Sequence, residues 1–183
     1  EYPHLHPLVP KRTQLKRVLV FFGGVDQNNL TSQALKALMD SALSDLAVDV
    51  VIGRQSPHWK AVQKLMDKLP NATLHGPLPS LAGLMVRADL AIGAGGSTTW
   101  ERACLGLPSL VIAIATNQLQ STQALHRAGH LQSLGREGRV SIEEIRSALV
   151  ARLHNPDAKG AGSGLTDGWG VSRQAMAMLG PQE

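Results

Sequence analysis

The sequence is poor in the features that hold small secreted proteins together or place a chain in a membrane. It has one cysteine, Cys104, which excludes a disulfide framework. No apolar run approaches the length of about 18 residues that suggests a membrane span, and no signal peptide is visible, so we expect a soluble, cytoplasmic protein. Aromatic residues make up only 3% of the 183 residues, so the core must be built from Leu, Val, Ile and Ala.

Other absences exclude whole classes of ligand site. There is no Gly-Lys-Ser/Thr sequence and therefore no P-loop. No acidic residue lies between Arg102 and Arg136, where a dinucleotide-binding domain would carry the acid that holds a ribose, so NAD is not expected. His126 and His130 are separated by Gly129 and a predicted helix end, and we expect neither a metal site nor a cofactor.

The net charge of +4 invites a nucleic-acid interpretation, because four basic residues gather in Lys11-Arg12 and Lys16-Arg17. Few aromatic side chains are available to stack on bases, however, and the other basic residues are dispersed. A basic segment beside a diphosphate site explains the charge better, and no nucleic-acid partner is expected.

What is present is organised around the stretch 89–118. Leu90-Ala91-Ile92 predicts a strand buried on both faces, and Gly93, Gly95 and Gly96 follow it. Ser97 or Thr98 can then begin a helix, which Gly106 and Pro108 end before a second strand over Ser109–Ala115. A glycine turn that leads into a helix exposes backbone N–H groups to an anion, most often a phosphate. The glycines alone also fit a purely steric turn.

A second unit of this kind lies near the start of the chain. The strand Arg17–Phe22 runs into Gly23-Gly24, and a helix follows over Leu30–Leu43. Asn28 or Asn29 can cap that helix, or either can face a ligand. Because both glycine turns follow strands, they can converge on one ligand.

The rest of the chain continues the alternation of strands and helices. Strands are expected over Val48–Ile52, Ala72–His75 and His130–Leu134, helices over Pro57–Lys68, Ser80–Arg87, Asn117–Ala128, Ser141–His154 and Val171–Leu179, and a mobile connection over Asn155–Gly170. Six strands alternating with helices predict an α/β fold with a doubly wound, parallel, Rossmann-like sheet. Ligands of such sheets bind beyond the carboxyl ends of the strands.

Three strings carry a resemblance to a known family: RVLVFFGGVDQNNLT, LMVRADLAIGAGG and AIGAGGSTTWERACLGLPSLVIAIATNQ. They resemble the C-terminal half of the UDP-sugar hydrolases of pseudaminic acid biosynthesis, which act on UDP-2,4-diacetamido-2,4,6-trideoxy-β-L-altropyranose. More distantly, they are similar to the C-terminal domains of GT-B glycosyltransferases. The resemblance is specific over residues 17–118 and looser beyond.

The resemblance implies a linker remnant over residues 1–16 and a UDP-binding domain over residues 17–183. It also implies that the catalytic histidine lies in an absent N-terminal domain, so this chain would bind UDP or a UDP-sugar with little or no turnover. The whole protein would cleave the sugar–phosphate bond and release UDP. The alternatives are the donor-binding domain of a GT-B glycosyltransferase and a non-catalytic nucleotide-sugar module.

The candidate site residues follow from the two glycine turns and from the family. Nucleotide and phosphate would contact Gly23, Gly24, Asn28, Leu78, Gly95, Gly96, Ser97, Thr98 and Glu101, and the sugar would contact Asn117 and Gln118. Glu101 has two interpretations: a capping box with Thr98, or a carboxylate that accepts both ribose hydroxyls, as the family implies. Asn117 could instead only cap its helix, Leu78 would act through its main chain, and a lone His75 at a strand end is more often structural than an acid.

Overall fold

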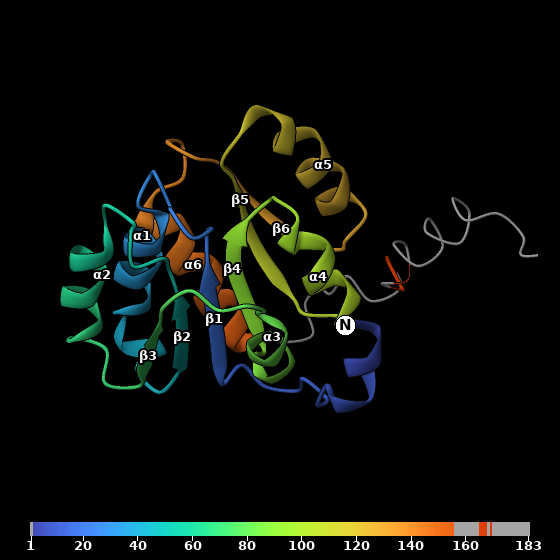
Figure 1. Ribbon diagram of the computed structural model, residues 1–183, viewed down its shortest axis with the longest axis horizontal. Helices are drawn as coiled ribbons and strands as arrows, with labels where there is room; N and C mark the ends of the chain where they lie inside the picture. The colour runs from blue at the N-terminus through green and yellow to red at the C-terminus, as the bar shows by residue number, and fades with distance from the viewer. Residues whose placement is uncertain (1, 156–164, 168, 170–183) are drawn as a thin grey trace, which may run out of the picture.

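The computed structural model describes residues 2–155, 165–167 and 169, and its centre is one parallel sheet (Figure 1). The six strands lie in the order β3-β2-β1-β4-β5-β6. Their bounds are β1 Arg17–Phe21, β2 Ala47–Val51, β3 Ala72–His75, β4 Leu90–Ala94, β5 Ser109–Ala113 and β6 Gln132–Arg136. The predicted doubly wound, Rossmann-like fold is confirmed.

Helices cover both faces of this sheet. The bounds are α1 Leu30–Leu38, α2 Trp59–Met66, α3 Ala82–Arg87, α4 Thr98–Cys104, α5 Thr116–Arg127 and α6 Ile142–His154, with short 3-10 helices η1 Tyr2–Leu8 and η2 Ser41–Leu43. α1 packs against α2 and α6 on one face, and Figure 1 shows α3 in front of the sheet with α6 behind it. α5 lies against β5 and β6.

The central strands are apolar because both of their faces are covered. All five residues of β4 and all five of β5 are buried, as expected for a parallel sheet sandwiched between helices. One apolar cluster joins the sheet to α1, α2 and α6, and a second joins Leu19, Ala91 and Met85 to the loop after α4. Aliphatic side chains supply nearly all of this core, as the shortage of aromatic residues predicts.

The ends of several helices and strands differ from those predicted from the sequence. The helix predicted over 30–43 ends at Leu38, because Asp40 breaks it and accepts a hydrogen bond from the N–H of Ala42 to begin the separate turn η2. The strand predicted over 109–115 ends at Ala113. Of the connection predicted over 155–170, only 155, 165–167 and 169 are described, and the helix predicted over 171–179 lies outside the described residues.

The N-terminal segment packs on the domain rather than extending from it. Arg12 donates four hydrogen bonds to carbonyl oxygens at the ends of two helices: those of Met85 and Ala88 at α3, and those of Leu105 and Gly106 at α4, at 2.8–3.1 Å. Burial lowers the pKa of this guanidinium, with Asp89 acting in the opposite direction. A single cation therefore neutralises the negative ends of both helices.

Strands β1 and β4 are neighbours in the sheet although some seventy residues separate them in the chain, and Phe21 pairs with Gly93. From β1 the chain winds outwards to β2 and β3, and from β4 it winds the opposite way to β5 and β6. The loops that follow β1 and β4 diverge at this switch point, which is where ligands bind in such sheets. No helix among the described residues is long and apolar enough to cross a membrane.

Candidate functional site

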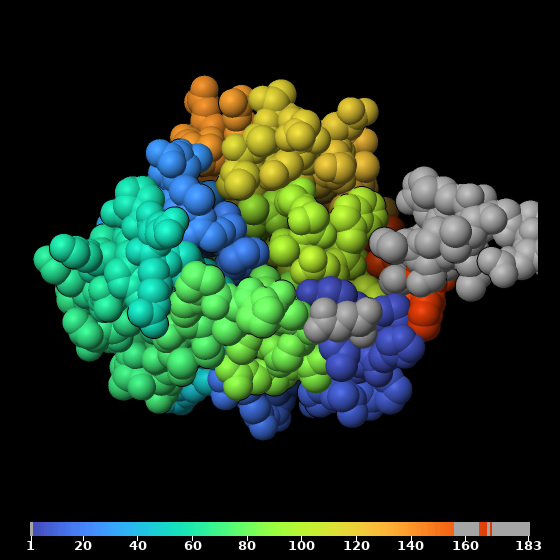
Figure 2. Space-filling view, viewed as in Figure 1, coloured from blue at the N-terminus to red at the C-terminus, as the bar shows by residue number. Residues whose placement is uncertain are grey.

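A pocket of about 520 Å³ opens at the carboxyl ends of β1, β2 and β3. It is lined by Phe21, Gly24, Val25, Val51, Ile52, Gly53, Arg54, Gln55, Ser56, Pro77, Leu78 and Leu81. Figure 2 shows the blue loop after β1 lying between the teal loop after β2 and the yellow-green residues of α4. The first glycine turn and Leu78, both predicted to contact a nucleotide, therefore share one concave and largely apolar surface.

Two hydrogen bonds fasten the loops after β1 and β2 to each other. The N–H of Gly53 donates to the carbonyl oxygen of Gly24 at 2.8 Å. The hydroxyl of Ser56 donates to the carbonyl oxygen of Val25 at 2.7 Å. A side chain at Gly53 would strike the Gly24 carbonyl oxygen at 2.6 Å, whereas a Cβ at Gly24 would meet no atom within 4 Å. The Gly24 backbone is thus fixed from one side and open to a ligand on the other.

Helix α1 is capped by a residue that sequence reasoning missed. The carboxylate of Asp26 accepts hydrogen bonds from the N–H groups of Leu30 and Thr31, at 3.0 and 2.9 Å. Asn29 occupies the N-cap position in a left-handed conformation, but its side chain makes no capping bond, and Asn28 is exposed. Asn29 therefore has the predicted N-cap position, but neither asparagine caps α1 through its side chain, and a carboxylate just ahead of a helix was the available signal for Asp26.

The second glycine turn is shaped partly by α5. A Cβ at Gly95 would lie 2.4 Å from the hydroxyl oxygen of Thr122, and one at Gly96 would lie 3.6 Å from the amide nitrogen of Gln118. Gly95 therefore has a steric reason to be glycine, while Gly96 has room. Ser97 is the N-cap residue of α4 and Thr98 its first residue, and no side-chain capping bond forms there.

Glu101 lies in the first turn of α4 but forms no capping box. Its Oε2 instead accepts a hydrogen bond of 2.9 Å from the hydroxyl of Tyr2. α6 shows what a capping box looks like in this chain, because Ser141 and Glu144 exchange both of its hydrogen bonds. The capping interpretation of Glu101 is wrong, and the ribose interpretation stays a prediction.

A buried cation lies beneath the second glycine turn. Arg102 is only 3% exposed, and it donates to the carbonyl oxygen of Ala94 at 2.8 Å and to the hydroxyl of Thr99 at 3.0 Å. Burial lowers its pKa to about 10, with Glu101 acting in the opposite direction. Nothing in the sequence analysis identified Arg102. The burial of Arg102 beside Thr99 depends on how α4 packs on the sheet, so no local sequence signal could have found it.

The predicted sugar-binding amides lie at the start of α5, after β5. Ala115 is the N-cap residue, so Asn117 lies inside the helix and its expected capping role is wrong. Asn117 is exposed. Gln118 accepts a hydrogen bond of 3.0 Å from the N–H of Ile114 through its Oε1, while its amide nitrogen lies near Gly96. The structure thus brings Gln118 beside the second glycine turn.

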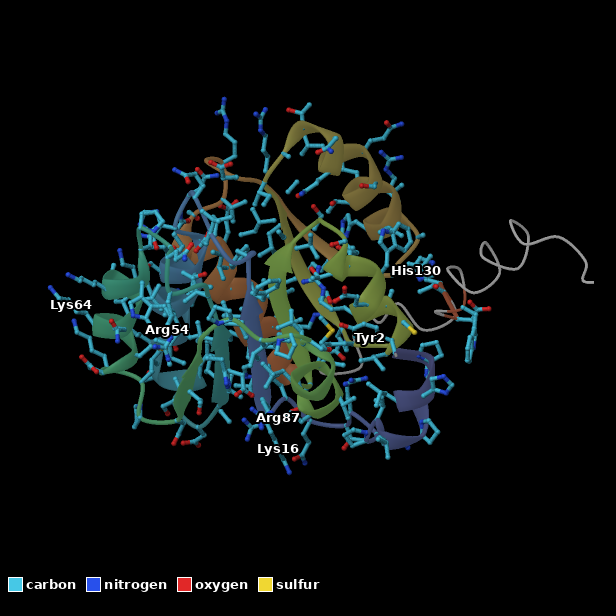
Figure 3. The ribbon with its side chains drawn as sticks, in the orientation of Figure 1. Tyr2, Lys16, Arg54, Lys64, Arg87 and His130 are labelled. Atoms are coloured by element: carbon cyan, nitrogen blue, oxygen red, sulfur yellow. The ribbon has the colours of Figure 1, made fainter. Side chains whose placement is uncertain are left out.

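His75 belongs to a structural cluster on the sheet. Its Nε2 lies 2.7 Å from the carboxylate of Asp49, a buried residue that also pairs with Arg17 and Arg87, at 3.0 and 2.6 Å. Burial opposes ionisation of Asp49, but the hydrogen bonds from His75, Arg17 and Arg87 prevail and hold its pKa below the ordinary value. This supports the structural interpretation of His75. Figure 3 labels Arg87, at the end of α3.

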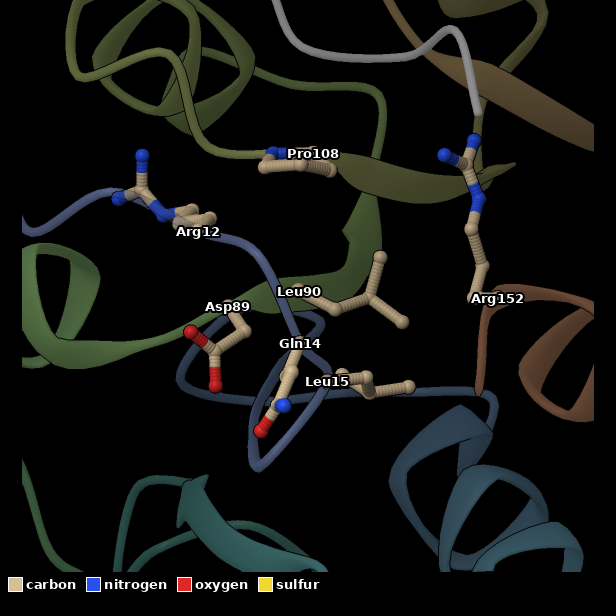
Figure 4. A pocket seen from close by; sticks show the side chains of 7 residues that line it. All are labelled: Arg12, Gln14, Leu15, Asp89, Leu90, Pro108 and Arg152. Carbon is tan, nitrogen blue, oxygen red and sulfur yellow. The ribbon is translucent and has the colours of Figure 1, made fainter. Parts of the chain in front are cut away.

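The opposite edge of the sheet carries a small cavity of about 10 Å³ (Figure 4). It lies at the amino ends of the strands, among Arg12, Gln14, Leu15, Asp89, Leu90, Pro108 and Arg152. Space of this size holds about one water molecule. The carboxylate of Asp89 is already used there by the N–H groups of Lys16 and Arg17. In the part of the chain that the structure describes, no group of three His, Cys, Asp or Glu side chains could hold a metal ion.

Comparison with known sequences identifies a family and several relatives. The model of the glycosyltransferase family 28 C-terminal domain matches residues 17–161. The spore coat polysaccharide biosynthesis protein SpsG of Bacillus subtilis (strain 168) is 31% identical over 166 residues, which are 86% of this chain and 48% of SpsG. A UDP-N-acetylglucosamine–N-acetylmuramyl-(pentapeptide) pyrophosphoryl-undecaprenol N-acetylglucosamine transferase of Exiguobacterium sp. (strain ATCC BAA-1283 / AT1b) is 29% identical over 143 residues, 74% of this chain and 39% of that enzyme.

Comparison with solved structures agrees on the fold. UDP-GlcNAc 2-epimerase from Neisseria meningitidis, bound to UDP-GlcNAc, superposes with a TM-score of 0.67 at 17% identity and covers 97% of this chain and 48% of the epimerase. The chain spans about half the length of SpsG and of this epimerase. The matched region of the sequence begins at β1 and contains both glycine turns.

Proposed function

Because this chain belongs to the family of glycosyltransferase family 28 C-terminal domains, we propose that it is the donor-binding domain of a GT-B glycosyltransferase and that it holds the UDP part of a nucleotide sugar. One observation carries the proposal. An apolar pocket, a glycine turn with open space above its backbone and a second glycine turn followed by Glu101 all lie at the carboxyl edge of one parallel sheet.

We assign each part of a UDP-sugar to one surface of this arrangement. The base would enter the pocket between Phe21 and Leu81, where the main chain at Leu78 supplies hydrogen-bonding groups. The diphosphate would lie against the backbone N–H groups of the two glycine turns. Glu101 would accept the ribose hydroxyls, and Asn117 and Gln118 would face the sugar, because amides both donate and accept hydrogen bonds.

In the transfer reaction, an acceptor hydroxyl attacks the anomeric carbon while the bond from that carbon to the diphosphate breaks. The leaving UDP gains negative charge, which backbone N–H groups and a nearby cation stabilise best in a site that is shielded from water. Arg102 supplies a buried positive charge beneath the second turn. The acceptor and the base that takes its proton would come from outside this chain.

The UDP-sugar hydrolase of pseudaminic acid biosynthesis stays as a second candidate, because the unbroken string from Ala91 to Gln118 resembles that family. The curated relatives reported above include a transferase and no hydrolase, so the transferase takes precedence. The two candidates differ in what receives the sugar. A protein that joins this chain to an N-terminal domain would give free sugar and UDP if it is a hydrolase. A transferase would release UDP only with an acceptor.

We expect the chain 1–183 to bind UDP more tightly than UMP and much more tightly than ADP. Two glycine turns serve a diphosphate better than a monophosphate, and loss of one charge-assisted phosphate contact costs about 1.5–3 kcal/mol, roughly ten- to a hundredfold in affinity. Adenine presents a different pattern of donors and acceptors to the main chain at Leu78. Isothermal titration calorimetry tests this order. Equal affinities for UDP and ADP would contradict the proposal that the site binds uridine. Equal affinities for UDP and UMP would contradict the proposal that it binds a diphosphate.

A further inference from the structure

A hydrogen bond joins the N-terminal segment to Glu101, the residue proposed to hold the ribose. The hydroxyl of Tyr2 lies 2.9 Å from Oε2 of Glu101, although 99 residues separate the two in the chain. We propose that Tyr2 is a positioning residue: its hydroxyl orients the Glu101 carboxylate so that this carboxylate accepts ribose hydroxyls without rearranging. This inference rests on the proposed function.

The geometry leaves Glu101 able to serve a ligand. Tyr2 uses one lone pair of Oε2, while Oε1 accepts no hydrogen bond from any residue that the structure describes. An ionised carboxylate has about four acceptor positions, so it can keep the phenol and still accept two hydroxyls. Figure 3 labels Tyr2 between the blue N-terminal segment and the green helix α4.

The N-terminal segment is anchored well enough to act as a fixed support. η1 packs against both α3 and α4. Tyr2, Leu5 and Val9 pack on the apolar cluster formed by Leu19, Val51, Leu81, Leu84, Met85, Ala88, Ala91, Leu105 and Leu107. Beyond them, the four hydrogen bonds of Arg12 fix the segment to the ends of the same two helices. Tyr2 therefore approaches Glu101 from an ordered part of the molecule.

Fixing a glutamate side chain in one rotamer costs conformational entropy. If the side chain is free before binding, this cost reduces the affinity for the ligand. A free Glu side chain samples many rotamers, and a ligand that needs one of them loses affinity by the fraction of time spent in the others. A phenol that holds the carboxylate in place beforehand removes this cost. The benefit reaches only ligands that contact the carboxylate, so it should favour ribonucleotides over nucleotides that lack the 2′ and 3′ hydroxyls.

The test compares the variants Tyr2→Phe and Glu101→Gln, the double variant and the wild type, all in the chain 1–183. The probes are UDP and 2′,3′-dideoxy-UDP, titrated by calorimetry. Phenylalanine keeps the packing of the ring and removes only the hydroxyl. Leu8→Ala is the matched control, because Leu8 lies in the same 3-10 helix and is 65% exposed.

We expect Tyr2→Phe to weaken UDP binding about three- to tenfold and Glu101→Gln about five- to thirtyfold. The double variant should be no weaker than Glu101→Gln alone, because the phenol acts only through the carboxylate. Neither Tyr2→Phe nor Leu8→Ala should change the affinity for dideoxy-UDP, and the melting temperatures should stay within about 2 °C of the wild type.

Several outcomes would overturn the positioning role while leaving the proposed function intact. They are an unchanged or higher UDP affinity for Tyr2→Phe, additive losses in the double variant, or an equal loss with dideoxy-UDP, each alongside the expected loss for Glu101→Gln. A higher affinity would mean that the phenol competes with the ribose. If Glu101→Gln binds UDP normally, or if the wild type does not bind UDP, the proposed ribose site fails and the role of Tyr2 fails with it.

Discussion

Gly24→Ala should weaken UDP binding about thirtyfold or more, equivalent to about 2 kcal/mol, with no loss of thermal stability. The added Cβ meets no atom within 4 Å in the unliganded chain, so the fold has no reason to change. It would, however, stand where a diphosphate is proposed to approach the backbone, and would cost at least one charge-assisted hydrogen bond. Calorimetry with UDP measures the first effect, and thermal unfolding monitored by circular dichroism measures the second.

Gly83→Ala is the matched control for this experiment. Gly83 is exposed in α3, and a Cβ there also meets no atom within 4 Å. It lies in a helix rather than in a glycine turn, so UDP affinity should be unchanged. Normal UDP binding by Gly24→Ala would show that no ligand contacts this turn closely, and the proposed diphosphate site would have to be abandoned.

Gly93→Ala should produce the largest loss of stability, at least about 3 kcal/mol. Its Cβ would lie 2.4 Å from the carbonyl oxygen of Phe21 and 2.5 Å from a guanidinium nitrogen of Arg102. The first contact is with backbone of the neighbouring strand, to which Gly93 is paired, so relief requires β1 and β4 to separate. Differential scanning calorimetry should show a melting temperature lower by roughly 6–12 °C.

Gly83→Ala is also the control for stability, and its expected effect on the free energy of unfolding is opposite to that of Gly93→Ala. Gly83→Ala should stabilise the domain by about 0.5–1 kcal/mol, because alanine is the better helix former at an unobstructed position. A melting temperature for Gly93→Ala that equals the wild-type value would mean that the two central strands are looser than the structure indicates.

Much of the fold could be predicted because a strand buried on both faces of a parallel sheet is a short, continuous apolar run that is easily recognised in a sequence. Arg17–Phe21 and Leu90–Ala94 are short, almost wholly apolar runs that end at glycines, and both are strands. Helix ends were harder to predict: α1 stops at Leu38, and the side chain of Asp40 accepts a hydrogen bond that begins the next turn. Such choices depend on single hydrogen bonds rather than on periodicity.

The candidate site was partly predictable for a topological reason. The glycine turns, Leu78 and Gln118 all follow strands, and parallel strands bring their carboxyl ends to one edge. The contacts that shape the site were not predictable. Tyr2 meets Glu101 across 99 residues, and Arg102 is buried under the second glycine turn while its neighbour Glu101 is half-buried. Local patterns contain no information about such pairings, because the tertiary fold creates them.

The strand order of the sheet changes direction between β1 and β4, and this also bears on how domains of this kind can diversify. The pocket proposed for the base is lined by residues 21–81, whereas Glu101, Asn117 and Gln118 all come from the other half of the sheet. The two halves meet along the single boundary where β1 pairs with β4. If the proposed site is right, mutations that alter the accepted base can accumulate on one side without disturbing the residues proposed to face the sugar. We expect base preference and sugar preference to evolve, and to be engineered, as two independent traits.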